Sequence, residues 1–112
     1  MMNDIIANFI RARRIDSFQK LRLLLLLHRN PKMKGTQEEL AKRLHLGHTF
    51  PLEDIITGLH RAGLLNCVDN HFTLQDEPEI REGLHYLARA FENPLTRLEL
   101  LDQLKSHPVY KH

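Results

Sequence analysis

The chain has 112 residues, of which 42% are hydrophobic and 27% are charged, and its formal net charge is +2. This length predicts one domain with a modest core that needs no covalent staples. The single cysteine, Cys67, excludes an internal disulfide and a cysteine-based zinc site, and it fits a reducing, cytoplasmic environment.

The charge is unevenly distributed. Residues 1–35 hold eight basic and two acidic residues, a local charge of +6, whereas residues 36–63 carry −1 and residues 64–112 carry −3. Attraction to nucleic acid is therefore expected mainly from the first third of the chain. The longest apolar run, residues 23–27, is far shorter than the roughly 20 residues that cross a bilayer. We expect neither a secretory signal nor a membrane segment.

Two helices are predicted at the N-terminal end. Residues 1–16 carry one apolar stripe, formed by Ile5, Ile6, Phe9 and Ile10. The next helix spans residues 18–29, with Ser17 as its cap, and its six leucines predict a central position in the core. Asn30-Pro31 ends it, because proline disfavours the helical conformation of the residue before it.

The segment "TQEELAKRL", residues 36–44, begins with a capping box of Thr36 and Glu39. Gly47 allows a tight turn, and another helix is expected from about Pro51 to Ala62, where Gly63 stops it. The strands "LLNCV" and "HFTL" follow, separated by two residues typical of a hairpin turn. We expect Val68, Phe72 and Leu74 to face inward and Asn66, His71 and Thr73 to be more exposed.

Two further helices are predicted after residue 75. Acidic residues precede and open "DEPEIREGLHYLARAF", as the helix dipole favours, and Asn93-Pro94 starts the last helix. The leucines of that last helix lie on two faces: Leu95, Leu98, Leu100, Leu101 and Leu104. The apolar terminal helices either pack against each other or meet a second copy. The two-faced last helix favours a homodimer built from terminal helices.

The order helix, helix, tight turn, helix and hairpin resembles a winged helix-turn-helix domain. The likeness is carried by Thr36 to Leu74, above all by "T-x-E-E-L-A-x-x-L" and by "L-x-x-A-G-L-L" from Leu59 to Leu65. It is similar to the DNA-binding domains of arsenic-repressor-like and multiple-antibiotic-resistance-regulator-like bacterial regulators. The resemblance implies a homodimer on palindromic double-stranded DNA, with the helix after Pro51 in the major groove.

The predicted fold is mainly α with a small β-hairpin, a single winged-helix domain over residues 1–112. Its core is about residues 17–75, with a helical extension at 1–16 and two C-terminal helices in 76–112. Basic residues before the core are candidates for phosphate contacts, and outward residues of the third core helix are candidates for groove contacts. The candidate DNA-binding residues are Arg11, Arg13, Arg14, Thr49, Thr57, His60 and Arg61.

A second interpretation stays open, that of a winged-helix module for protein contacts without DNA binding. Glu53 and Asp54 lie in the first turn of the groove helix, where they either favour the helix start or repel a phosphate backbone. No Lys or Arg occurs between Leu64 and Gln75, although a wing that grips phosphate usually carries positive charge.

No chemistry-bearing motif suggests an enzyme. The chain has eight histidines, but none forms a metal-ligand spacing with two or three further ligands. There is no nucleophile with its base and no glycine-rich phosphate loop. We therefore expect no catalytic residue, no metal and no cofactor.

Overall fold

A computed structural model of the chain describes residues 4–32, 35–44 and 52–105. Their elements are, in order, α1 (Asp4–Ala12), α2 (Phe18–Arg29), α3 (Gln37–Arg43), α4 (Leu52–Arg61), β1 (Leu65–Val68), β2 (His71–Leu74), α5 (Pro78–Glu92) and α6 (Pro94–Lys105). The expected class is confirmed at the level of a mainly helical chain with one small two-stranded antiparallel sheet. None of the described helices has the length and apolar character needed to cross a membrane.

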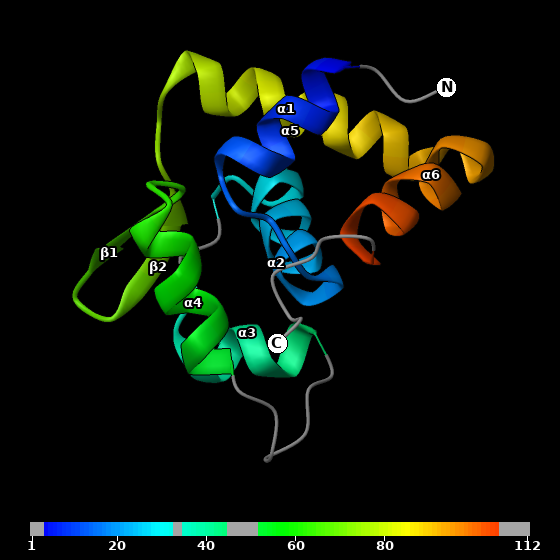
Figure 1. Cartoon of the computed structure of the whole chain (residues 1–112). Helices are drawn as coiled ribbons and strands as arrows, with labels where there is room; N and C mark the ends of the chain where they lie inside the picture. Colours follow the sequence, from blue (N-terminus) through cyan, green and yellow to red (C-terminus); the bar gives the residue numbers. More distant parts are fainter. Residues whose placement is uncertain (1–3, 33–34, 45–51, 106–112) are drawn as a thin grey trace, which may run out of the picture.

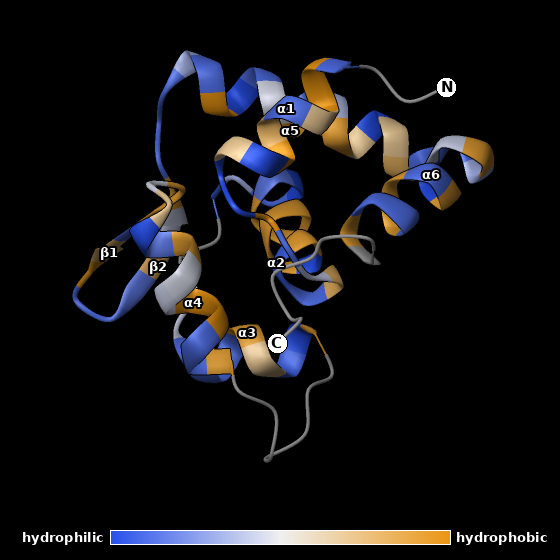
Figure 2. Cartoon of the chain, viewed as in Figure 1, coloured by the Kyte–Doolittle hydropathy of each residue, from blue (hydrophilic) through white to orange (hydrophobic). Residues whose placement is uncertain are grey.

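Helix α2 lies at the centre of the molecule, in contact with α4, α5 and β2 (Figure 1). Its leucines make it the largely hydrophobic helix that the others surround in Figure 2. The predicted cap is confirmed, since the Ser17 hydroxyl accepts a hydrogen bond of 3.2 Å from the amide of Lys20. At the other end the Asn30 side-chain amide donates to the carbonyl oxygen of Leu26 at 2.8 Å. Both ends of the core helix are thus closed by side chains that the sequence places there.

Helix α1 packs on α5, so the N-terminal apolar stripe is buried within the chain except for Ile5, which is 50% exposed. The two helices approach closely at Gly83, where a Cβ atom would lie 2.6 Å from the ring of Phe9. The chain leaves α1 through Arg14, whose φ of 55° is left-handed. The amide of Ile15 donates to the carbonyl of Ile10 at 3.0 Å, which completes a Schellman-type helix end.

Helices α3 and α4 pack against each other beside α2. The Thr36 hydroxyl accepts from the amide of Glu39 at 3.2 Å, which confirms that half of the predicted capping box. The Glu39 carboxylate itself forms an ion pair with Arg43 at 3.7 Å. Helix α4 buries its apolar stripe, Leu52, Ile55, Ile56 and Leu59. Gly63 ends it with a φ of 79°.

The hairpin is confirmed, but one of its faces is not as predicted. Its register pairs Leu65 with Leu74 and Val68 with His71, across a turn whose residues Asp69 and Asn70 both have positive φ. Val68 is 57% exposed, so its predicted inward position is wrong. The register is the reason. A cross-strand pair shares one face of the sheet, so Val68 lies on the outer face with His71.

A backbone contact joins the hairpin to the segment before α3. The amide of Phe72 donates to the carbonyl oxygen of Gly35 at 2.9 Å, in an isolated antiparallel bridge. Because this bridge occupies the free edge of β2, the hairpin is attached to the helices by backbone as well as by side chains.

Helix α6 buries one of its two apolar sides against the rest of the described chain and leaves the other exposed. Asn93 Oδ1 accepts from the amide of Leu95 at 2.9 Å and caps the helix, as predicted. Leu100 and Leu104 are buried, whereas Leu95 is 75% and Leu98 67% exposed. We call Leu95 and Leu98 the α6 apolar face.

Candidate nucleic-acid interface

In the part of the chain that the structure describes, no other element covers the outward side of α4. Five exposed side chains recur at helical spacing along it: Glu53, Asp54, Thr57, His60 and Arg61. Helix α4 lies at the edge of the molecule beside the hairpin (Figure 1). Three of the predicted DNA-contacting residues, Thr57, His60 and Arg61, therefore share one accessible face.

Charge changes sign along this face. Glu53 and Asp54 occupy the first turn of α4, and His60 and Arg61 occupy the last. This arrangement opposes the helix dipole at both ends and so stabilises the helix. It also gives the two ends opposite preferences for an approaching anion, with the C-terminal half the more favourable end.

The candidate Arg13 is engaged inside the fold. One of its guanidinium nitrogens donates to the carbonyl oxygen of Ala62 at 3.1 Å, just after α4, and the other lies 3.3 Å from a carboxylate oxygen of Glu79. Its side chain is 22% exposed. Arg13 therefore links α1 to the ends of α4 and α5.

Arg14 and Lys20 lie beside α4. The Lys20 ammonium donates to the backbone carbonyl of Arg14 at 3.3 Å and pairs with Asp16 at 2.8 Å. A Cβ atom added to Gly58 of α4 would lie 3.0 Å from the same ammonium. The exposed Arg14 is thus held close to the C-terminal half of α4. Lys20 is not among the residues predicted from the sequence, because no local pattern reveals its contact with α4.

The remaining candidate DNA-binding residues are Arg11 and Thr49. Arg11 is exposed, and its guanidinium donates to the Asn8 side chain of its own helix at 3.4 Å. Thr49 lies outside the described residues. Thr57, His60 and Arg61 thus share the exposed face of α4, and the backbone of Arg14 lies near that helix through Lys20. Arg11 stays on the surface of α1, and Arg13 makes contacts within the fold.

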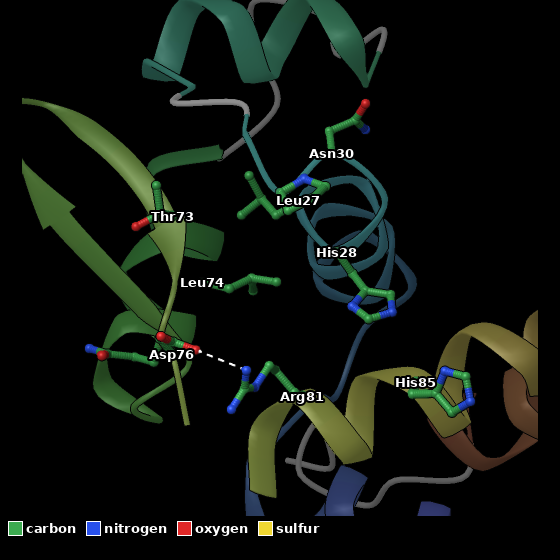
Figure 3. Close-up of a pocket in the computed structure, with 10 residues that line it drawn as sticks. Leu27, His28, Asn30, Thr73, Leu74, Asp76, Arg81 and His85 are labelled. Carbon is green, nitrogen blue, oxygen red and sulfur yellow. Dashed lines mark ion pairs between the residues drawn. The ribbon is translucent and has the colours of Figure 1, made fainter. Parts of the chain in front are cut away.

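A pocket of about 470 Å³ opens on another side of the molecule, between the end of α2, β2 and the beginning of α5. Figure 3 shows Leu27 and Leu74 within it, with His28 reaching from α2 toward α5 and Arg81 directed to Asp76. Burial, with the nearby positive charges of His85 and Arg29, lowers the pKa of His28. The sequence could not indicate this pocket, because its walls come from three separated elements.

The described residues contain no group of three or more His, Cys, Asp or Glu side chains placed to hold a metal ion. Cys67 is exposed on β1. A comparison of the chain with models of known protein families, with curated proteins and with solved structures finds no match in any of the three.

Proposed function

We propose that the segment from Ser17 to Gln75 is a winged helix-turn-helix and that the protein binds double-stranded DNA as a regulator of transcription, not as an enzyme. The order α2, α3, α4, β1 and β2 supports the winged-helix assignment, as does the bridge between Gly35 and Phe72. The observation that carries the DNA proposal is the exposed outer face of α4, since a helix that enters the major groove needs one.

In this proposal the duplex meets the C-terminal half of α4 most closely. Arg61 and Arg14 contact phosphates, with Arg11 further along the backbone, and Thr57 and His60 reach base edges. Glu53 and Asp54 limit the approach of the first turn. A carboxylate 4 Å from a phosphate costs roughly 4 kcal/mol at an effective dielectric of 20.

We further propose that two copies pair through the α6 apolar face. The N-terminal helix is already buried against α5, so of the two terminal stripes it is α6 that offers an unused apolar surface. A two-fold dimer would present two copies of α4 to a palindromic site in the cytoplasm.

The test is a fluorescence-anisotropy titration of labelled mixed-sequence duplexes over a range of salt concentrations. A regulator binds, and the logarithm of its affinity falls with the logarithm of salt by about 0.9 per phosphate contact. Arg61→Ala and Arg14→Gly each reduce that slope by about one. The control is Arg89→Ala, an exposed arginine of α5, which α2 separates from α4. No binding at micromolar protein and low salt overturns the proposal.

One observation favours the second function, a winged-helix module that binds protein. The hairpin exposes Val68 and Cys67 beside Asp69, with no Lys or Arg from Leu64 to Gln75. Val68→Lys separates the two functions. Lysine at a DNA-contacting wing adds a phosphate contact and strengthens duplex binding. If Val68 instead contacts a protein, the substitution leaves the weak DNA affinity unchanged.

A further inference from the structure

The pocket between α2, β2 and α5 has one apolar side and one basic side. Leu27, Leu74 and Pro31 supply apolar surface, and His28, His85 and Arg81 supply groups that bind anions. Its volume of about 470 Å³ lies within the range of small-molecule sites. Leu27 and Leu74 come from α2 and β2, and Figure 3 shows Arg81 reaching in from α5.

We propose that this pocket binds a small organic carboxylate, with its apolar body against Leu27 and Leu74 and its carboxylate between His28 and Arg81. The pocket lies on other elements than the outer face of α4, so this inference does not rest on the proposed DNA binding.

The basic groups of the pocket are available to a ligand, whereas its amides are not. The Asn30 side chain already donates to Leu26, and the Gln75 side chain donates to the carbonyl of Leu65 at 3.3 Å. Among the described residues, neither His28 nor His85 has a hydrogen bond to the protein; the His85 ring lies 6.2 Å from that of Tyr86, tilted by 60°. The imidazoles can therefore donate to a bound anion.

Arg81 is held only by an exposed partner. Its guanidinium lies 3.5 Å from Asp76, and the two side chains are 63% and 86% exposed. Exposed pairs of this kind contribute little, so a ligand carboxylate can replace Asp76 on the guanidinium at low cost. Two parallel hydrogen bonds from arginine to carboxylate then fix the orientation of the ligand.

The surrounding charge favours an anion over a metal ion. The charged groups that line this pocket and the shallow groove on the other side of the two imidazoles are Arg29, Arg81, Arg89, Asp76 and Glu92. Three cations thus face two carboxylates, and protonation of His28 adds to the positive charge. A bound carboxylate opposes the burial and the positive neighbours that lower the pKa of His28. Binding therefore takes up protons and strengthens as the pH falls toward 6.

The test is a ligand titration of the full chain in which NMR monitors the signals of the histidine rings. The probes are hexanoate and 3-phenylpropanoate, each compared with its neutral amide, and inorganic phosphate. We expect saturable shifts of the His28 ring, with a dissociation constant of about 1 mM or below for at least one carboxylate. Each amide, and phosphate, should bind at least about tenfold more weakly, because the amide lacks the charge and phosphate lacks the apolar body.

Variants locate the site. His28→Gln and Arg81→Gln should each weaken carboxylate binding by about fivefold or more. His60→Gln, on the outer face of α4, is the matched control and should leave it unchanged. Between about pH 7.5 and pH 6 the affinity of the unmodified chain should rise, and that of His28→Gln should rise much less. An unchanged backbone NMR spectrum away from the pocket shows that each variant is folded.

Three results overturn the proposal. The first is no saturable shift at His28 with any carboxylate up to about 20 mM. The second is equal binding of carboxylate and amide, or of carboxylate and phosphate. The third is an affinity that neither pocket variant changes. None of these outcomes bears on DNA binding, which is measured separately on duplexes without carboxylate.

Discussion

The guanidinium of Arg13 donates a hydrogen bond of 3.1 Å to the carbonyl oxygen of Ala62, 49 residues further along the chain. This bond satisfies a backbone oxygen at the end of α4 and places a positive charge at the negative end of that helix. It makes Arg13 a structural residue, and it separates Arg13 from its neighbours Arg11 and Arg14, whose charges face solvent.

Replacing Arg13 with methionine should therefore lower the free energy of unfolding by about 1–2 kcal/mol, because a hydrogen bond to a charged group is lost. Urea denaturation followed by circular dichroism measures the change. Arg11→Met is the matched control and should cost less than about 0.5 kcal/mol. Equal costs for the two variants would show that the contact with Ala62 does not stabilise the fold.

Replacing Arg14 with glycine should stabilise the fold, in contrast to the replacement of Arg13. Its φ of 55° is a conformation that only glycine adopts without steric cost, so Arg14→Gly should raise the free energy of unfolding by about 0.5–1 kcal/mol. Arg14→Ala removes the same charge without relieving the backbone and should give no such gain. Thermal unfolding distinguishes the two. If both variants were equally stable, backbone conformation would not be the cause.

Gly83 and Gly58 are both helical glycines, but an added methyl group would meet different surroundings at the two positions. At Gly83 a methyl group would lie 2.6 Å from the Phe9 ring, so Gly83→Ala should force α1 away from α5 and cost about 1–3 kcal/mol. At Gly58 a methyl group would meet only the flexible end of Lys20, and Gly58→Ala should be neutral or stabilising by up to about 1 kcal/mol. Denaturation midpoints of both variants measure this. A destabilised Gly58→Ala with an unaffected Gly83→Ala would contradict the packing described for α1.

The lowered pKa of His28 predicts a dependence of stability on pH. The unfolded chain binds a proton at this imidazole near pH 6.5, while the folded chain binds it only at lower pH. The contribution to stability is thus complete above the ordinary histidine pKa and is lost as the pH falls through the folded pKa. In His28→Gln the unfolding free energy should fall less over this range, with His60→Gln as the control. An unchanged pH profile in His28→Gln would count against the burial of this ring.

Local signals predicted the elements well. The Ser17, Thr36 and Asn93 caps act on amides two or three residues away, so the pattern that predicts each of them lies entirely within one turn of helix. The hairpin likewise depends on two turn residues. Val68 was misplaced because a strand's facing depends on register, and the alternation of apolar residues in "LLNCV" fits either face.

Contacts between residues that are far apart in the chain could not be predicted from local sequence patterns. Nothing near Arg13 indicates Ala62, and nothing near Lys20 indicates Gly58, so the basic residues of the first third looked alike. The pocket shows the same limit. His28 and His85 are 57 residues apart and come together only because α2 packs on α5. Exposure of the α4 face, in contrast, followed from helical periodicity alone.

The packing of α1 on α5 has a consequence for synthesis. The partner that covers Phe9 and Ile10 begins near residue 78, so the first helix leaves the ribosome long before its binding surface exists. During that interval its apolar side is open to chaperones or to aggregation. The growing chain can pack α1 on α5 only after the residues up to Glu92 have been synthesised.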